Sequence, residues 1–146
     1  MFGEFIKRLT APQPARLPDA DARLALTALL VRVARSDGYY AEAEKAQIDA
    51  AMSQRYGLDG PAMEELRAQA EVLEAEAPDT VRFTRAIKDA VGYEDRLGVI
   101  EALWGVVLAD GERAKEEDAL LRLVSSLLGV EDMDSNLARK RVEASL

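Results

Sequence analysis

The chain has 146 residues, 49% of them hydrophobic, and a formal net charge of −8. A chain of this length forms one ordinary domain with its own core, and its acidic balance disfavours nucleic acid as a partner. The absence of cysteine and histidine excludes disulfides, thiol and imidazole catalysis, and the usual zinc, copper and iron–sulfur sites. Oxygen ligands remain, and these suit Ca²⁺ or Mg²⁺, so we expect no zinc, haem or nucleotide.

The N-terminal segment is expected to be a short helix followed by a linker. Four apolar residues fall on one helical face: Phe2, Phe5, Ile6 and Leu9. Residues 2–9 could contact a membrane, but we expect them to dock on the domain. Three prolines then make residues 10–18 an extended, loosely packed linker. We therefore divide the chain into residues 1–18 and a helical domain over 19–146, with no bilayer-spanning run or secretory signal, and expect a cytoplasmic protein.

A long helix with apolar residues nearly all round is predicted from Pro18 to Ser36, with Asp19 or Asp21 as its cap. Such a helix belongs in the middle of a bundle. An amphipathic helix follows and ends before Gly57, a residue suited to the left-handed conformation at a helix end.

Two further helices have capping aspartates, Asp59 and Asp79, and end at Pro78 and Gly92. The remaining helices are one from about Glu94 to Ala109, one that ends before Gly129, and one that begins at Asp132 or Asp134. No segment alternates with period two, so we expect no strand. The pattern predicts an all-α bundle of seven or eight helices.

One motif, Asp-Gly followed by five residues and Glu, occurs twice. The two copies are Asp37-Gly38 with Glu44, and Asp110-Gly111 with Glu117. Each copy follows an apolar helix and opens an amphipathic one. The same order of elements recurs over residues 22–77 and 95–143, which predicts two helix–loop–helix repeats related by pseudo-twofold symmetry. Residues 22–36 and 95–109 would form a central buried pair.

The duplicated loops have a purely structural interpretation and a metal-binding one. Glycine can end a helix, Asp can fold into an Asx-turn, and Glu in the next first turn faces the positive end of the helix dipole. However, Ala41 and Ala114 stand where a capping box needs a polar side chain. The loop carboxylates could instead draw in a cation, although Gly directly after Asp excludes an EF-hand. The candidate metal ligands are Asp37, Glu44, Asp110 and Glu117.

The two loops, the run Leu-Trp-Gly-Val-Val-Leu-Ala before Asp110, and the lead-in Tyr93-Glu-Asp-Arg-Leu97 resemble the TerB-like tellurite-resistance family. The N-terminal domain of DjlA-type co-chaperones is similar. The resemblance covers about residues 20–143. It implies an all-α pseudo-twofold domain, a bacterial cytoplasmic or membrane-peripheral protein, and divalent cations at Asp37, Glu44, Asp110 and Glu117.

The chain departs from the family pattern in both loops. Tyr40 and Arg113 stand where the family often has an aliphatic residue, and Ala41 and Ala114 where it often has a polar one. The loss of a polar residue in both copies weakens the metal interpretation.

Three functions follow as hypotheses. The first is a cation-binding scaffold module in a stress or tellurite response, with a protein partner that the sequence does not identify. The second is a protein-interaction domain without metal. The third is a carboxylate-based, metal-dependent hydrolase. We expect no enzyme and no catalytic residues, because carboxylates alone would have to supply both acid and base.

Overall fold

The computed structural model describes residues 1–12, 16–36, 38, 40–109 and 115–145. These residues form eight helices and no strand, as predicted. The helices are α1 (Gly3–Leu9), α2 (Asp19–Arg35), α3 (Glu42–Tyr56), α4 (Gly60–Glu76), α5 (Thr80–Ala90), α6 (Tyr93–Ala109), α7 (Lys115–Leu127) and α8 (Asp132–Ser145).

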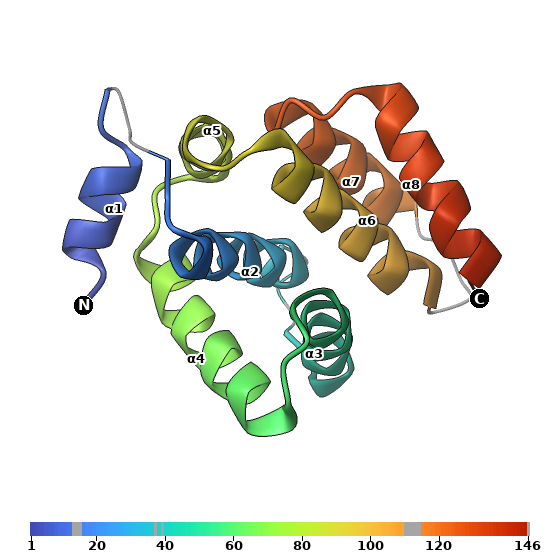
Figure 1. The fold of residues 1–146 in the computed structure, drawn as a ribbon, viewed down its shortest axis with the longest axis horizontal. Coiled ribbons are helices and arrows are strands. Elements are labelled where there is room, and N and C mark those ends of the chain that lie inside the picture. The colour runs from blue at the N-terminus through green and yellow to red at the C-terminus, as the bar shows by residue number, and fades with distance from the viewer. Residues whose placement is uncertain (13–15, 37, 39, 110–114, 146) are drawn as a thin grey trace.

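The helices gather in two groups, one of α2, α3 and α4 and the other of α6, α7 and α8, with α5 between them (Figure 1). Helix α2 packs mainly against α4, and α6 packs mainly against α8. Contacts of α3 with α6, and of α5 with both α2 and α7, join the groups. The predicted helices at residues 22–36 and 95–109 both contribute many buried residues to the core, but they contact each other only slightly. Their principal partners are instead α4 and α8.

Local sequence signals set most of the helix ends. The Asp59 and Asp79 carboxylates accept hydrogen bonds from the backbone N–H groups of Ala62 (2.8 Å) and Arg82 (3.2 Å), as predicted for N-caps. Gly57 ends α3 in the left-handed conformation, with φ 65°.

The predicted cap of α2 was wrong. Pro18 takes the N-cap position, and its carbonyl accepts the first helical hydrogen bond from Ala22 N–H at 2.9 Å. Asp19 and Asp21 consequently lie inside the first turn, where their charge favours the positive end of the helix without capping it.

The core consists mainly of aliphatic side chains from α2 to α8. Leu26, Leu29 and Ile100 are fully buried, and Trp104 is 4% exposed, as expected for the two apolar helices. None of the helices in the described part of the chain has the length and apolar character that crossing a membrane requires.

Helix α1 docks on the domain, as expected. Phe5 and Leu9 are buried in the main core. Residues 10–12 and 16–18 form no helix or strand, which agrees with the predicted linker. The linker is less loose than expected, because Leu17 packs against the core and its N–H donates to the Ala90 carbonyl at 3.0 Å.

Candidate functional site

Of the four predicted metal ligands, the structure describes the side chain of Glu44 alone. Asp37 and Asp110 lie outside the described residues. Glu117 lies in the first turn of α7, and its side chain is also outside the description. Glu44 is partly buried in the first turn of α3, where a glutamate in this motif was predicted to fall. The predicted sharing of one cation by both loops therefore stays a prediction.

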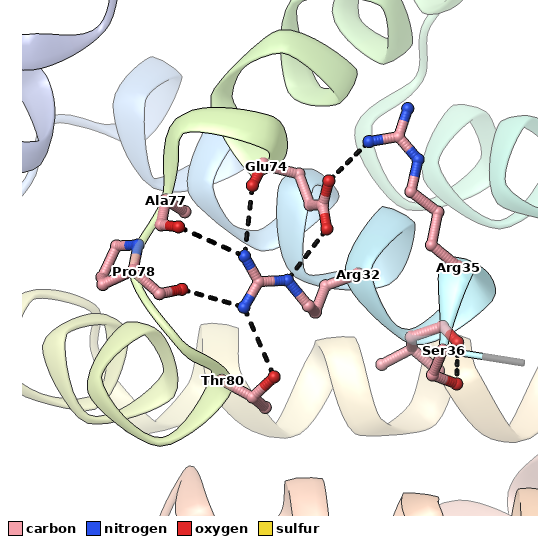
Figure 2. A network of polar contacts seen from close by, with 8 residues as sticks. Arg32, Arg35, Ser36, Glu74, Ala77, Pro78 and Thr80 are labelled. Atoms are coloured by element: carbon pink, nitrogen blue, oxygen red, sulfur yellow. Dashed lines mark hydrogen bonds and ion pairs between the residues drawn. The ribbon is translucent and has the colours of Figure 1, made fainter. Parts of the chain in front are cut away.

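The chain enters the first loop from the last turns of α2, which are anchored by Arg32 (Figure 2). The Arg32 guanidinium donates from Nε to Glu74 Oε1 at 2.9 Å and from Nη2 to the Glu74 carbonyl at 3.1 Å. Its Nη1 donates to the Pro78 carbonyl at 2.9 Å and to Thr80 Oγ1 at 3.3 Å. The carbonyls at the end of a helix lack intrahelical donors, so one arginine both caps α4 and ties α2 to it.

Glu74 receives a second cation from the same helix. Arg35 Nη1 donates to Glu74 Oε2, while Arg32 holds Oε1 (Figure 2). Glu74 is only 8% exposed, and a buried carboxylate is tolerated when paired charges and hydrogen bonds replace its water. The pair of arginines fixes the end of α2 just before the Asp-Gly motif.

Tyr40 stands where the chain leaves the loop. Its ring contacts two cations, with Arg35 Cζ and Lys45 Nζ each 4.9 Å from the ring centroid. Such contacts are attractive because cations favour the negative face of an aromatic ring. Burial raises the pKa of Tyr40 well above its ordinary value, and the neighbouring Glu71 carboxylate raises that pKa further. The departure from the family pattern at this position thus puts a neutral aromatic anchor beside the loop.

A third arginine, Arg67, joins α3 to α4. Arg67 Nε donates to Asp49 Oδ1 at 2.8 Å, and its Nη1 lies 3.5 Å from Glu71 Oε1. Asp49, Glu71 and Glu74 are therefore all engaged by arginine. Within the described residues no group of three or more carboxylates is placed to hold a metal ion.

A groove lies between α3, α6 and α8, with a volume of about 660 Å³. Small residues line part of it: Ala50, Ala51, Gly98, Ala102 and Gly105. Polar side chains line the rest, and among them Arg141 Nε donates to Glu101 Oε1 at 2.8 Å.

The glycines of α6 give this groove its shape. A Cβ on Gly98 would lie 2.1 Å from the Arg55 guanidinium carbon, so glycine lets Arg55 lie across α6. A Cβ on Gly105 would meet nothing within 4 Å. Sequence reasoning missed the groove because three helices form it; the spacing of Gly98, Ala102 and Gly105 on one face of α6 was the available signal.

The family model described as tellurite resistance protein TerB matches residues 23–140. No curated protein and no solved structure matches the chain. The family match covers most of α2, all of α3 to α7 and most of α8, and it includes both Asp-Gly motifs. The chain belongs to the TerB tellurite-resistance family.

Proposed function

We propose that the chain is a TerB-type helical module that binds Ca²⁺ or Mg²⁺ through Asp37, Glu44, Asp110 and Glu117. In this role it acts as a non-catalytic scaffold in a stress response such as that to tellurite. The observation that carries the proposal is the equivalent placement of the two glutamates. Glu44 lies in the first turn of α3 and Glu117 in the first turn of α7, each seven residues after its aspartate.

The pseudo-twofold relation of the two halves is part of this proposal. It is supported by the packing of α2 on α4 and of α6 on α8, and by the order of the helices. Equivalent loops in the two halves would then present equivalent carboxylates.

The driving force for cation binding would be electrostatic. Neighbouring carboxylates in a protein of net charge −8 repel each other, and a divalent ion relieves that repulsion. The anchored arginines support the first site, because Arg32 and Arg35 fix the start of the loop and leave fewer conformations to be lost on binding.

Thermal unfolding with and without millimolar Ca²⁺ or Mg²⁺ tests the proposal. A cation that binds the folded state should raise the melting temperature of the wild type. Asp37→Asn/Asp110→Asn should abolish that rise. Glu64→Gln/Glu65→Gln, which removes the same charge from exposed positions of α4, should retain it. An equal rise in all three proteins would mean that the loops are not the site.

The groove between α3, α6 and α8 favours a second candidate function, a protein-interaction domain without metal. Its small residues would admit a side chain or a helix of a partner protein. Gly105→Phe should fill the groove without disturbing the fold, since the Cβ position is open. Loss of a partner in co-purification with Gly105→Phe but not with exposed Arg122→Ala would support this function, and retention by both variants would refute it.

A further inference from the structure

Three cationic side chains, one of them from the segment before α2, approach the region where α5, α6 and α7 meet. A Cβ on Gly92 would lie 2.7 Å from Arg16 Nη1. A Cβ on Gly129 would lie 2.8 Å from Lys88 Cε and 3.2 Å from Arg96 Nη1. The two glycines therefore leave room for three positive groups in an otherwise acidic protein.

Arg96 joins the two positions. Its Nε donates to the Val91 carbonyl at 3.0 Å, next to Gly92, and its Nη1 donates to the Leu128 carbonyl, next to Gly129. One guanidinium thus spans the ends of α5 and α7, beside the two glycines that Arg16 and Lys88 approach. These bonds also give Arg96 a structural role, since they satisfy carbonyls at the ends of two helices.

Arg16 and Lys88 have no such role. Both side chains are exposed, and neither has a hydrogen-bond or ion-pair partner among the residues that the structure describes. Burial lowers the pKa of Arg96, and the charge of Arg16 lowers it further, while Tyr93 and Asp89 act in the opposite direction. The charge of Arg16 therefore reaches Arg96, where the Asp89 carboxylate opposes it. Like charges held close together repel each other, and a bound anion relieves that repulsion.

We propose that Arg16, Lys88 and Arg96 form a binding site for a phosphate-type dianion, either free or as a phosphate-monoester group. A compact group with two negative charges matches three converging cations better than a single carboxylate does. Guanidinium and ammonium donors both make charge-assisted hydrogen bonds to phosphate oxygens. The site is separate from the Asp-Gly loops and does not depend on cation binding.

Calorimetric titration with inorganic phosphate and with pyrophosphate, at constant ionic strength, tests the site. We expect saturable binding to the wild type and a loss of affinity of about tenfold or more in Arg16→Gln/Lys88→Gln, which removes two charge-assisted contacts. Arg122→Gln/Lys140→Gln removes the same charge from exposed positions of α7 and α8 and should bind like the wild type. Circular dichroism should show native helix content in both variants, because neither removes a described contact.

Vesicles that contain phosphatidic acid in phosphatidylcholine distinguish the two sources of the ligand. Binding to soluble phosphate assigns a free ligand, and binding to the vesicles alone assigns a lipid headgroup, provided that Arg16→Gln/Lys88→Gln abolishes either one. The inference is overturned if neither probe binds the wild type. It is equally overturned if both double variants lose affinity to the same extent, because net charge alone would then explain the binding.

Discussion

Glu74 is the residue on which the anchoring of the first loop depends. Two arginines of α2 donate hydrogen bonds to its buried carboxylate. Removing the carboxylate therefore leaves two partly buried guanidinium groups without a counter-charge. Because Arg32 and Arg35 are partly exposed, we expect Glu74→Ala to lower the free energy of unfolding by about 2–4 kcal/mol. Urea denaturation would measure this loss. Exposed Glu65→Ala on the same helix should change the stability by less than about 0.5 kcal/mol, and an equally small effect of Glu74→Ala would contradict the anchoring role.

Tyr40 should titrate at higher pH than an ordinary tyrosine. Burial and the Glu71 carboxylate raise its pKa above the ordinary value of 10.0. With a raised pKa, the folded state retains the Tyr40 proton to higher pH than the unfolded state does. The resulting contribution to stability is complete below pH 10.0 and is lost as the pH rises above it. In a pH titration, the tyrosinate absorbance of the wild type minus that of Tyr40→Phe should therefore rise at a higher pH than for an ordinary tyrosine. A difference curve with its midpoint near the ordinary value would show that the ring is solvated.

At the scale of single elements, α1 is a part of the core rather than a loose extension. Leu9 is 1% exposed, and truncating a fully buried leucine removes apolar burial and leaves a cavity. We expect Leu9→Ala to lower the free energy of unfolding by about 2–4 kcal/mol. Exposed Lys7→Ala on the same helix serves as the control in urea denaturation. Equal stabilities of the two variants would mean that α1 is detached in solution.

Docking of α1 should weaken in acid. Glu76 accepts a hydrogen bond from the Phe2 N–H at 2.7 Å, and this bond lowers the pKa of Glu76 below its ordinary value of 4.5. For a carboxylate with a lowered pKa, the contribution is present above pH 4.5 and is lost as the pH falls through the lowered value.

Amide hydrogen exchange measures this dependence. Exchange at residues 3–9 should accelerate in acid relative to α5. In Glu76→Gln, the exchange of α1 relative to α5 should be fast at all pH values. If the acceleration in acid persists in this variant, another group is responsible for it.

Helix positions were predictable where one short segment decides them. Asp59 and Asp79 each accept a hydrogen bond from the N–H three residues further on, and Gly57 adopts the left-handed conformation that ends α3. The cap of α2 was mispredicted because Pro18 starts a helix through its carbonyl and fixed φ, without a capping side chain.

At the scale of the whole molecule, the arginine anchor at Glu74 and the cationic cluster depend on contacts between residues that no short sequence pattern predicts. The bond between Arg32 and Glu74 joins residues 42 positions apart. The cluster of Arg16, Lys88 and Arg96 exists only because the ends of α5 and α7 meet around one guanidinium. The duplicated Asp-Gly motif could be found from sequence because its residue spacing is the same in both copies.

Binding of divalent cations by those loops is the central claim, and titration calorimetry with CaCl₂ and MgCl₂ tests it most directly. We predict saturable heat with the wild type that decreases as the pH falls and the carboxylates become protonated. Asp37→Asn/Asp110→Asn should remove that heat, and Glu64→Gln/Glu65→Gln should preserve it. Absence of saturable heat from the wild type at millimolar cation, or its persistence in Asp37→Asn/Asp110→Asn, would contradict the claim.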